Sequence, residues 1–173
     1  MFSTSALKSM QAIVLGGSGQ VGSRLVTSLL RLSPTDCTII TLISRRPLDD
    51  FKNDDRVSVQ IVEFDNLEDK SADSIFKDHN AAFMLMGIGQ ARKASKEELE
   101  RIDADVPIAF SAACARNGVK HMSVLSTVGA VSKQNYSRWT DTAAGGGWYC
   151  FCKGKMEEGI KALTGFQSVL FFQ

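Results

Sequence analysis

Short apolar runs alternate with amphipathic or polar stretches along nearly the whole chain. Six of these runs have the length and composition of buried strands. They span residues 11–15, 37–44, 57–62, 81–86, 120–125 and 167–172. Most of the stretches between them are expected to form helices, over residues 21–30, 71–77, 95–116 and 147–163. This alternation predicts a doubly wound α/β fold, with a parallel sheet of order 3-2-1-4-5-6 and helices on both faces.

The longest expected helix has recognisable signals at both ends. Ser95 and Glu98 form a capping box at its start, and Asn117 followed by Gly118 supplies a left-handed stop. Pro107 lies inside this helix. Because proline has no backbone N–H and clashes with the preceding turn, we expect a kink or a break there.

A glycine-rich turn joins the first strand to the first helix. Gly16, Gly19 and Gly22 fall three residues apart. The first glycine allows a sharp turn, the second leaves room for a pyrophosphate, and the third lets the helix lie close to the strand. The helix then offers free N–H groups and a partial positive charge to phosphates. This pattern predicts a dinucleotide site, and a plain glycine turn is the alternative. The expected cofactor-binding residues here are Gly16, Gly17, Ser18, Gly19, Gln20, Val21 and Gly22.

The end of the second strand indicates which dinucleotide is bound. A ligand at the glycine turn extends its adenosine ribose toward this point, where NAD-binding proteins usually place an acid. Here the strand ends in Ser44, Arg45 and Arg46, with no acid. Two guanidinium groups would attract a 2′-phosphate and suit its geometry. We therefore expect NADP(H) rather than NAD(H), and two solvated arginines are the alternative.

Two further segments are expected to line the cofactor. The third strand runs into Glu63, Phe64 and Asp65, where the adenine should lie. Either carboxylate could accept a hydrogen bond from the exocyclic amine, depending on a register of one residue, and Phe64 could pack on the ring. Gly87, after the fourth strand, would let the backbone approach the cofactor ribose.

A tyrosine and a lysine share one face of the last expected helix. Tyr149 precedes Lys153 by four residues, whereas Tyr136 has no base at that spacing. A phenol with a pKa near ~10 transfers protons poorly at neutral pH, and a nearby ammonium lowers that pKa. Ser126 and Thr127 follow the fifth strand and could bind the reacting oxygen. A surface pair on a helix is the alternative for the tyrosine and lysine, but the order of these motifs favours a catalytic set.

Composition sets limits on the other function classes. The 173 residues, 44% of them hydrophobic, suit one domain over 1–173, with 1–10 as a flexible leader. A net charge of +1 gives no field to attract nucleic acid, and no apolar stretch is long enough to span a membrane. The four cysteines and two histidines lack the spacing of a metal site. We expect a cytoplasmic protein, with the mitochondrial surface as the alternative.

Taken together, these residues resemble the short-chain dehydrogenase/reductase superfamily in its atypical branch. Within it, the resemblance is to the Tat-interacting-protein-like oxidoreductases and related fungal mitochondrial proteins. Beyond the glycines it is carried by the segments Thr41–Arg46, Val62–Asp65, Arg101–Asp105, Val119–His121, Leu125–Ala130 and Lys153–Glu157.

The resemblance implies an NADPH-binding Rossmann domain with a Ser/Thr-Tyr-Lys catalytic set. Tyr149 would be the acid/base, and Lys153 would modulate its pKa and bind the ribose. Thr127 is the first choice for the catalytic hydroxyl, and Ser126 is the alternative. Asp105 would support the site from the long helix.

Three features depart from the family pattern. The segment 131–148 before the tyrosine is longer than usual. The family's Arg-Pro continuation of strand six and its substrate-binding segment are both expected to be absent. One interpretation is an NADP-dependent oxidoreductase that moves a hydride between NADPH and a small carbonyl or alcohol substrate. The alternative is a truncated cofactor-binding or regulatory module. The apolar run Val169–Phe172 would leave an exposed edge strand able to contact a partner.

Overall fold

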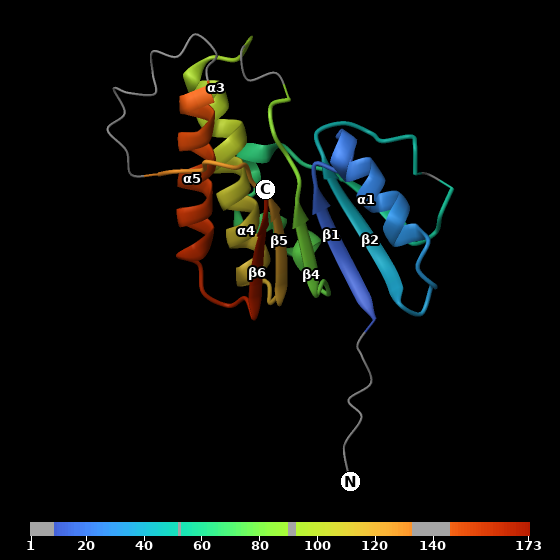
Figure 1. The fold of residues 1–173 in the computed structure, drawn as a ribbon. Helices are drawn as coiled ribbons and strands as arrows, with labels where there is room; N and C mark the ends of the chain where they lie inside the picture. Colours follow the sequence, from blue (N-terminus) through green and yellow to red (C-terminus); the bar gives the residue numbers. More distant parts are fainter. Residues whose placement is uncertain (1–8, 52, 90–92, 133–145) are drawn as a thin grey trace.

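The computed structural model describes residues 9–51, 53–89, 93–132 and 146–173. Its six strands form one sheet of order β3-β2-β1-β4-β5-β6, and all five strand pairs are parallel (Figure 1). This confirms the predicted α/β class and strand order. The strands are β1 (Met10–Leu15), β2 (Cys37–Ser44), β3 (Val57–Ile61), β4 (Ala81–Met84), β5 (His121–Leu125) and β6 (Ser168–Phe172).

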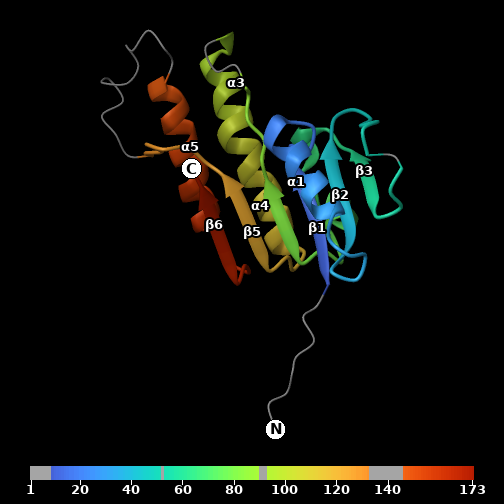
Figure 2. The same ribbon diagram turned by 45° about the vertical axis from the view of Figure 1, so that its right-hand side comes forward.

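Helices lie on both faces of the sheet, as Figures 1 and 2 show. The helices are α1 (Gln20–Leu30), α2 (Asp73–Phe76), α3 (Lys96–Glu100), α4 (Val106–Arg116) and α5 (Gly146–Lys161). Short 3₁₀ turns at Phe64–Asn66 and Lys70–Ala72 precede α2. Among the described residues no helix is long and apolar enough to cross a membrane.

Successive side chains of β1 point alternately into two separate apolar clusters, one on each face of the sheet. Ala12 and Val14 belong to the cluster under α1, whereas Ile13 and Leu15 belong to the larger cluster under α4 and α5. Successive side chains of a strand point to opposite faces, so one buried strand serves both clusters. The nearly continuous apolar runs of the sequence therefore reflect a sheet that is covered on both sides at its centre.

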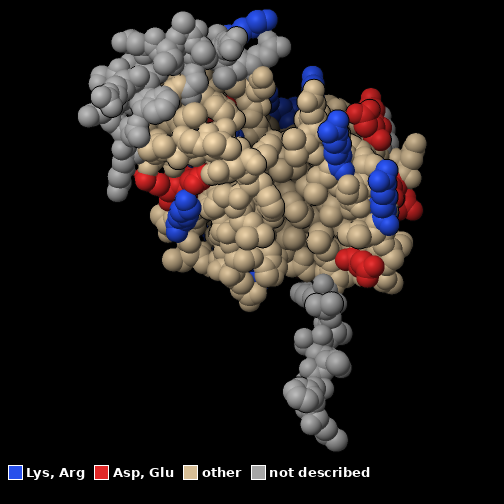
Figure 3. All heavy atoms as spheres, in the orientation of Figure 1, with Lys and Arg blue, Asp and Glu red and all other residues tan. Residues whose placement is uncertain are grey.

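Within the part of the chain that the structure describes, the cover of the outer strands on the α1 side is incomplete. Leu170 and Phe172 of β6 face that side and are 55% and 52% exposed. Figure 3 shows that the surface over β5 and β6 carries few charged side chains. The sixth strand is thus an apolar edge, as expected from its sequence.

The long helix predicted over 95–116 is interrupted by a π-helical turn. Residues Arg101–Asp105 form this turn between α3 and α4, and backbone dihedrals on both sides stay helical. Pro107 lies two residues after this turn and cannot donate a hydrogen bond back to it. The expected interruption at the proline is therefore a widened turn just before it, a form that often occurs at functional sites.

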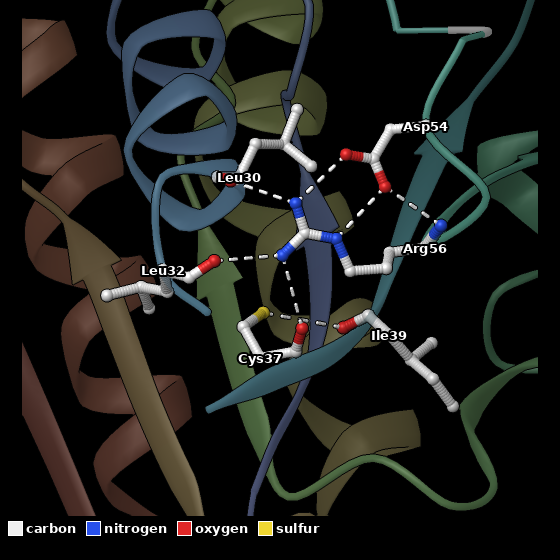
Figure 4. Close-up of polar contacts among 6 residues, drawn as sticks. All are labelled: Leu30, Leu32, Cys37, Ile39, Asp54 and Arg56. Carbon is white, nitrogen blue, oxygen red and sulfur yellow. Dashed lines mark hydrogen bonds and ion pairs between the residues drawn. The ribbon is translucent and has the colours of Figure 1, made fainter. Parts of the chain in front are cut away.

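Arg56 joins three segments at the end of the sheet opposite the site (Figure 4). Its guanidinium donates hydrogen bonds to the carbonyl oxygens of Leu30, Leu32 and Cys37, and it pairs with Asp54 at 2.9 Å. These carbonyls lie at or just beyond the end of α1 and at the start of β2. A cation at a helix C-terminus satisfies acceptors that the helix leaves free.

Candidate functional site

Two adjoining pockets open at the carboxyl end of the sheet. They have volumes of about 550 and 770 Å³. They meet where the strand order reverses between β1 and β4, the place where doubly wound sheets bind their ligands. The residues that line both pockets are Gly19, Leu85, Met86 and Gly87.

The glycine turn is shaped by close approach of backbone to backbone. Gly16 has a φ of +90°, and a Cβ there would lie 2.6 Å from the amide nitrogen of Met86. A Cβ on Gly22 would collide with the carbonyl of Gly16, and Gly19 donates a hydrogen bond to that same carbonyl at 3.1 Å. The turn thus needs glycine at the first and third positions for packing.

The second glycine, Gly19, leaves the backbone N–H groups at the start of α1 without a capping side chain. Gly19 is the N-cap of this helix and offers no side chain to its free N–H groups. Ser18, Gly19, Gln20 and Val21 all line one or both pockets. Gly17 does not line them, since it lies buried against Leu42.

Three consecutive residues line the smaller pocket, namely the last residue of β2 and the two arginines that follow it. Arg45 and Arg46 are exposed beside Ser44, whose hydroxyl accepts a hydrogen bond from the Arg46 amide at 3.2 Å. The guanidinium of Arg45 lies over the ring of Phe64, which also lines this pocket. The two arginines therefore border a hollow of nucleotide size next to an aromatic ring.

The two acids after β3 point to different surroundings. Glu63 lines the smaller pocket. Asp65 instead pairs with Arg101 at 2.6 Å, away from the pocket lining. Of the two acids, Glu63 is therefore the one that borders the smaller pocket.

The larger pocket brings Tyr149 and Lys153 together on α5. Both side chains line it with Leu125 of β5, and the Lys153 Nζ lies 5.8 Å from the centre of the Tyr149 ring. The side chain of Thr127 lies near enough to the phenol to oppose a rise in the pKa of Tyr149. Tyr136 lies outside the described residues, as does most of the segment 131–148.

The pKa of Tyr149 differs from the expectation. Burial raises it above its ordinary value, the negative charge of Asp103 raises it further, and the hydrogen bond from Thr127 opposes them. The prediction that Lys153 lowers this pKa is wrong for the site as it stands. The reason is that the Lys153 ammonium forms an ion pair with another residue and not with the phenol.

That partner is Asp103, in the π-helical turn. The Lys153 Nζ lies 3.0 Å from Oδ1 of Asp103, and the two side chains are 2% and 0% exposed. The ammonium also donates to the carbonyls of Met86 and Leu125 at 3.5 Å, the long limit for such contacts. A buried ion pair thus lies beneath the larger pocket.

The Ser126 hydroxyl forms its hydrogen bond away from the phenol. Its buried hydroxyl donates a hydrogen bond to Glu157 of α5 at 2.5 Å, and the same carboxylate pairs with Lys161. These two hydrogen bonds lower the pKa of Glu157, although burial opposes them. The structure therefore brings Thr127, and not Ser126, to the phenol.

Asp103 is the site residue that the sequence argument missed. Asp105, which was expected to support the site, is exposed and pairs with Lys155 at 2.8 Å, as does Glu100 at 2.7 Å. An α-helical register gives no reason to choose Asp103, because the π-turn alters the helical register here. Asp103 lies within Arg101–Asp105, a segment that carried the family resemblance.

The strand order and the divided pocket define a dinucleotide-binding α/β protein of the Rossmann class. Residues 16–167 match the model of a family described as NAD(P)H-binding, and the chain belongs to this family. The family match supports a nicotinamide dinucleotide as the cofactor of this chain.

Protein HTATIP2 of Rattus norvegicus is 26% identical over 132 residues, which cover 75% of this chain and 52% of HTATIP2. The chain thus spans about half the length of this curated relative. The fold is similar to WbmG of Bordetella bronchiseptica, solved with NAD (TM-score 0.70, 16% identity, 97% of this chain and 54% of WbmG). It is also similar to MoeE5, solved with UDP-glucose and NAD (TM-score 0.67, 20% identity, 93% of this chain and 52% of MoeE5).

Proposed function

We propose that this protein is an NADP(H)-dependent oxidoreductase that moves a hydride between NADPH and a carbonyl or alcohol substrate. The observation that carries the proposal is the larger pocket, where Tyr149 and Lys153 lie together beside the glycine turn. A phenol and an ammonium at one end of a dinucleotide site suit proton transfer to a substrate oxygen.

The residues present fit a dinucleotide. The turn at Gly16 leaves no room for side chains, and the uncapped start of α1 offers N–H groups to a pyrophosphate. The smaller pocket would take the adenosine half, between Arg45 and Phe64, and the larger one the nicotinamide half. The division of the pocket at Gly19 matches a ligand with two halves.

The preference for NADP(H) rests on charge. Arg45 and Arg46 border the smaller pocket where the adenosine ribose would lie. Guanidinium groups bind phosphate through paired hydrogen bonds, whereas a ribose with a free 2′-hydroxyl prefers an acid. Glu63 also lines this pocket, and we assign it to the adenine rather than to the ribose.

The side chains in and beside the larger pocket have separate roles in the proposed reduction. When bound, the reduced nicotinamide supplies a hydride to the carbonyl carbon. The Tyr149 hydroxyl donates its proton to the carbonyl oxygen, and the Thr127 hydroxyl next to the phenol helps to orient it. Lys153, held by Asp103 at 3.0 Å, would donate a hydrogen bond to a ribose hydroxyl of the cofactor. In the reverse direction Tyr149 accepts the proton of the alcohol.

The first test is a titration of the purified protein with NADPH and NADH, followed by nicotinamide fluorescence. We expect selective binding of NADPH, and we expect R45A/R46A to weaken NADPH binding at least tenfold more than NADH binding. The matched control is R24A/R31A, which removes two exposed arginines that do not line either pocket. Equal losses for both cofactors in R45A/R46A would remove the phosphate argument.

Catalysis is tested separately with Tyr149→Phe. This variant should bind NADPH as the wild type does and lose carbonyl reductase activity against a panel of aldehydes and ketones. Turnover by the wild type with none by Tyr149→Phe supports the enzyme. A wild type that binds NADPH tightly but reduces nothing in the panel would favour the binding module.

A further inference from the structure

The larger pocket has a mostly apolar lining. Among the described residues that line it, Lys153 carries the single charge, and its ammonium is already paired with Asp103 at 3.0 Å. A substrate with a phosphate or a carboxylate would therefore find no unpaired cation in this lining. The apolar residues of the lining are Val21, Leu85, Met86, Ile88 and Leu125.

An apolar strip leads from this pocket across the end of the sheet. Leu125 of β5 lines the pocket, and Phe172 of β6 is its partner in the parallel register. Side chains two residues apart on a strand share a face, so Leu170 lies on the same side as Phe172. Leu170 and Phe172 are more than half exposed. Leu125, Leu170 and Phe172 are called the apolar strip from here on.

Hydrogen bonds define where the apolar strip begins and ends. At its start, the Ser126 amide donates a hydrogen bond to the Phe172 carbonyl at 2.7 Å, which holds the end of β6 next to the segment that carries Thr127. At its far end, the side chains of His121 and Ser168 share a hydrogen bond of 2.9 Å. Neither β5 nor β6 contains Lys, Arg, Asp or Glu, and few charges lie over them in Figure 3. The strip thus runs from the site to a polar pair.

We propose that the substrate is a carbonyl compound with an apolar chain, such as a straight-chain aldehyde, and that this chain lies along the apolar strip. This inference rests on the proposed function. With its carbonyl oxygen at Tyr149, the molecule leaves the pocket past Leu125 and covers Phe172 and Leu170. NADPH transfers a hydride to the carbonyl carbon and Tyr149 transfers its proton to the oxygen. The products are NADP⁺ and an alcohol, and solvent returns a proton to the phenol.

Burial of apolar surface favours such a substrate over a polar one. A CH₂ group that is fully removed from water strengthens binding about fourfold. A chain that lies on a sheet face is covered from one side, so we expect a gain of about twofold for each CH₂ group. The gain should stop when the chain reaches the polar pair of His121 and Ser168.

The test compares kcat/KM for butanal, hexanal, octanal and decanal with NADPH. We expect kcat/KM to rise about twofold with each CH₂ group, and we expect Leu170→Asp to lower the ratio of decanal to butanal about tenfold. The matched control is Leu32→Asp, because Leu32 is 40% exposed and follows α1 at the opposite end of the sheet. Leu170→Ser repeats the comparison without a charge should Leu170→Asp not fold. A kcat/KM that stays constant along the series would overturn the proposal.

A binding measurement separates this inference from the proposed function. In titration calorimetry of the cofactor-free protein, decanol should bind the wild type and Leu32→Asp about tenfold more tightly than Leu170→Asp. If no aldehyde is reduced but decanol binds in this way, the oxidoreductase fails and the apolar ligand stands. If aldehydes are reduced but Leu170→Asp binds decanol as the wild type does, the strip has another occupant and the proposal is overturned. A dimer that Leu170→Asp dissociates would then identify that occupant as a second copy of this chain.

Discussion

The guanidinium of Arg45 lies 5.1 Å from the centre of the Phe64 ring. Arg45 follows β2 and Phe64 begins the short turn after β3, so the contact joins two walls of the smaller pocket. Phe64 is buried, and it holds the arginine over the pocket instead of leaving it free in solvent. A cation that is already placed loses less freedom when it binds a phosphate.

Phe64→Leu tests this placement. A cation–π contact at an exposed site contributes about 0.5–1 kcal/mol, so NADPH should bind roughly two- to fivefold more weakly. Fluorescence titration measures the change, and Phe51→Leu, outside the pockets, is the control. If Phe51→Leu weakened NADPH as much as Phe64→Leu does, the ring would have no special role.

Thr127→Val removes the hydroxyl that acts on the phenol of Tyr149. Because this hydroxyl helps to orient the proton donor, we expect reductase activity to fall at least tenfold with little change in NADPH affinity. Steady-state kinetics on a substrate found in the aldehyde and ketone panel give the comparison.

The neighbouring Ser126→Ala serves as the contrast. It leaves the partly buried Glu157 without its 2.5 Å hydrogen bond, which should cost about 1–3 kcal/mol of stability in urea unfolding. Its activity per folded molecule should stay near that of the wild type. The opposite pattern, with Ser126→Ala inactive and Thr127→Val active, would exchange the assigned roles.

Gly16→Ala should destabilise the fold strongly. The residue combines a φ of +90° with a space already filled by the Met86 amide, so both strain and a clash oppose a side chain. We expect a loss of about 2–4 kcal/mol in urea unfolding. Gly118→Ala is the matched control, because its φ is +85° but nothing lies within 4 Å of the added Cβ. Its loss should be about 1 kcal/mol, and equal losses would rule out the clash.

His79 predicts a pH dependence of stability. Its Nε2 lies 2.8 Å from the Thr41 hydroxyl and its Nδ1 3.2 Å from the Phe76 carbonyl, and burial lowers its pKa from the usual value. The unfolded chain binds a proton more readily than the folded one, so this stabilisation is complete above about pH 6.5 and is lost as the pH falls below it.

The measurement is urea unfolding at several pH values between about 7 and 5.5. The wild type should lose stability across this range more steeply than His79→Gln, which cannot titrate at this position. Parallel slopes for the two proteins would show that His79 is not the group responsible.

The order of the sheet follows from the sequence because it depends on periodicity and connectivity, both of which are local. The apolar run 37–44 coincides with β2 residue for residue. The run 81–86 was predicted too long, because β4 ends at Met84 and the next residues leave the sheet to form a pocket wall. Apolar character alone does not distinguish a strand from the wall of a cleft.

The candidate site was predicted less completely. Tyr149, Lys153 and the glycine turn were found because their spacing is fixed within one helix or one turn. The choice of Glu63 over Asp65 and of Thr127 over Ser126 depends on partners distant in sequence, namely Arg101 and Glu157. Asp103 was missed because its position depends on a change in helical hydrogen bonding, and the sequence pattern shows no such change.

The π-helical turn has a consequence for how this site tolerates mutation. Such a turn is an α-helix with one residue added, and each residue of a helix turns it by about 100°. Losing one residue between 101 and 105 would restore a regular helix and carry Asp103 away from Lys153. Substitutions at the exposed positions of the turn leave that geometry alone. We therefore expect natural variants of this protein to tolerate amino-acid substitutions at these exposed positions but not the deletion of a single residue from 101–105.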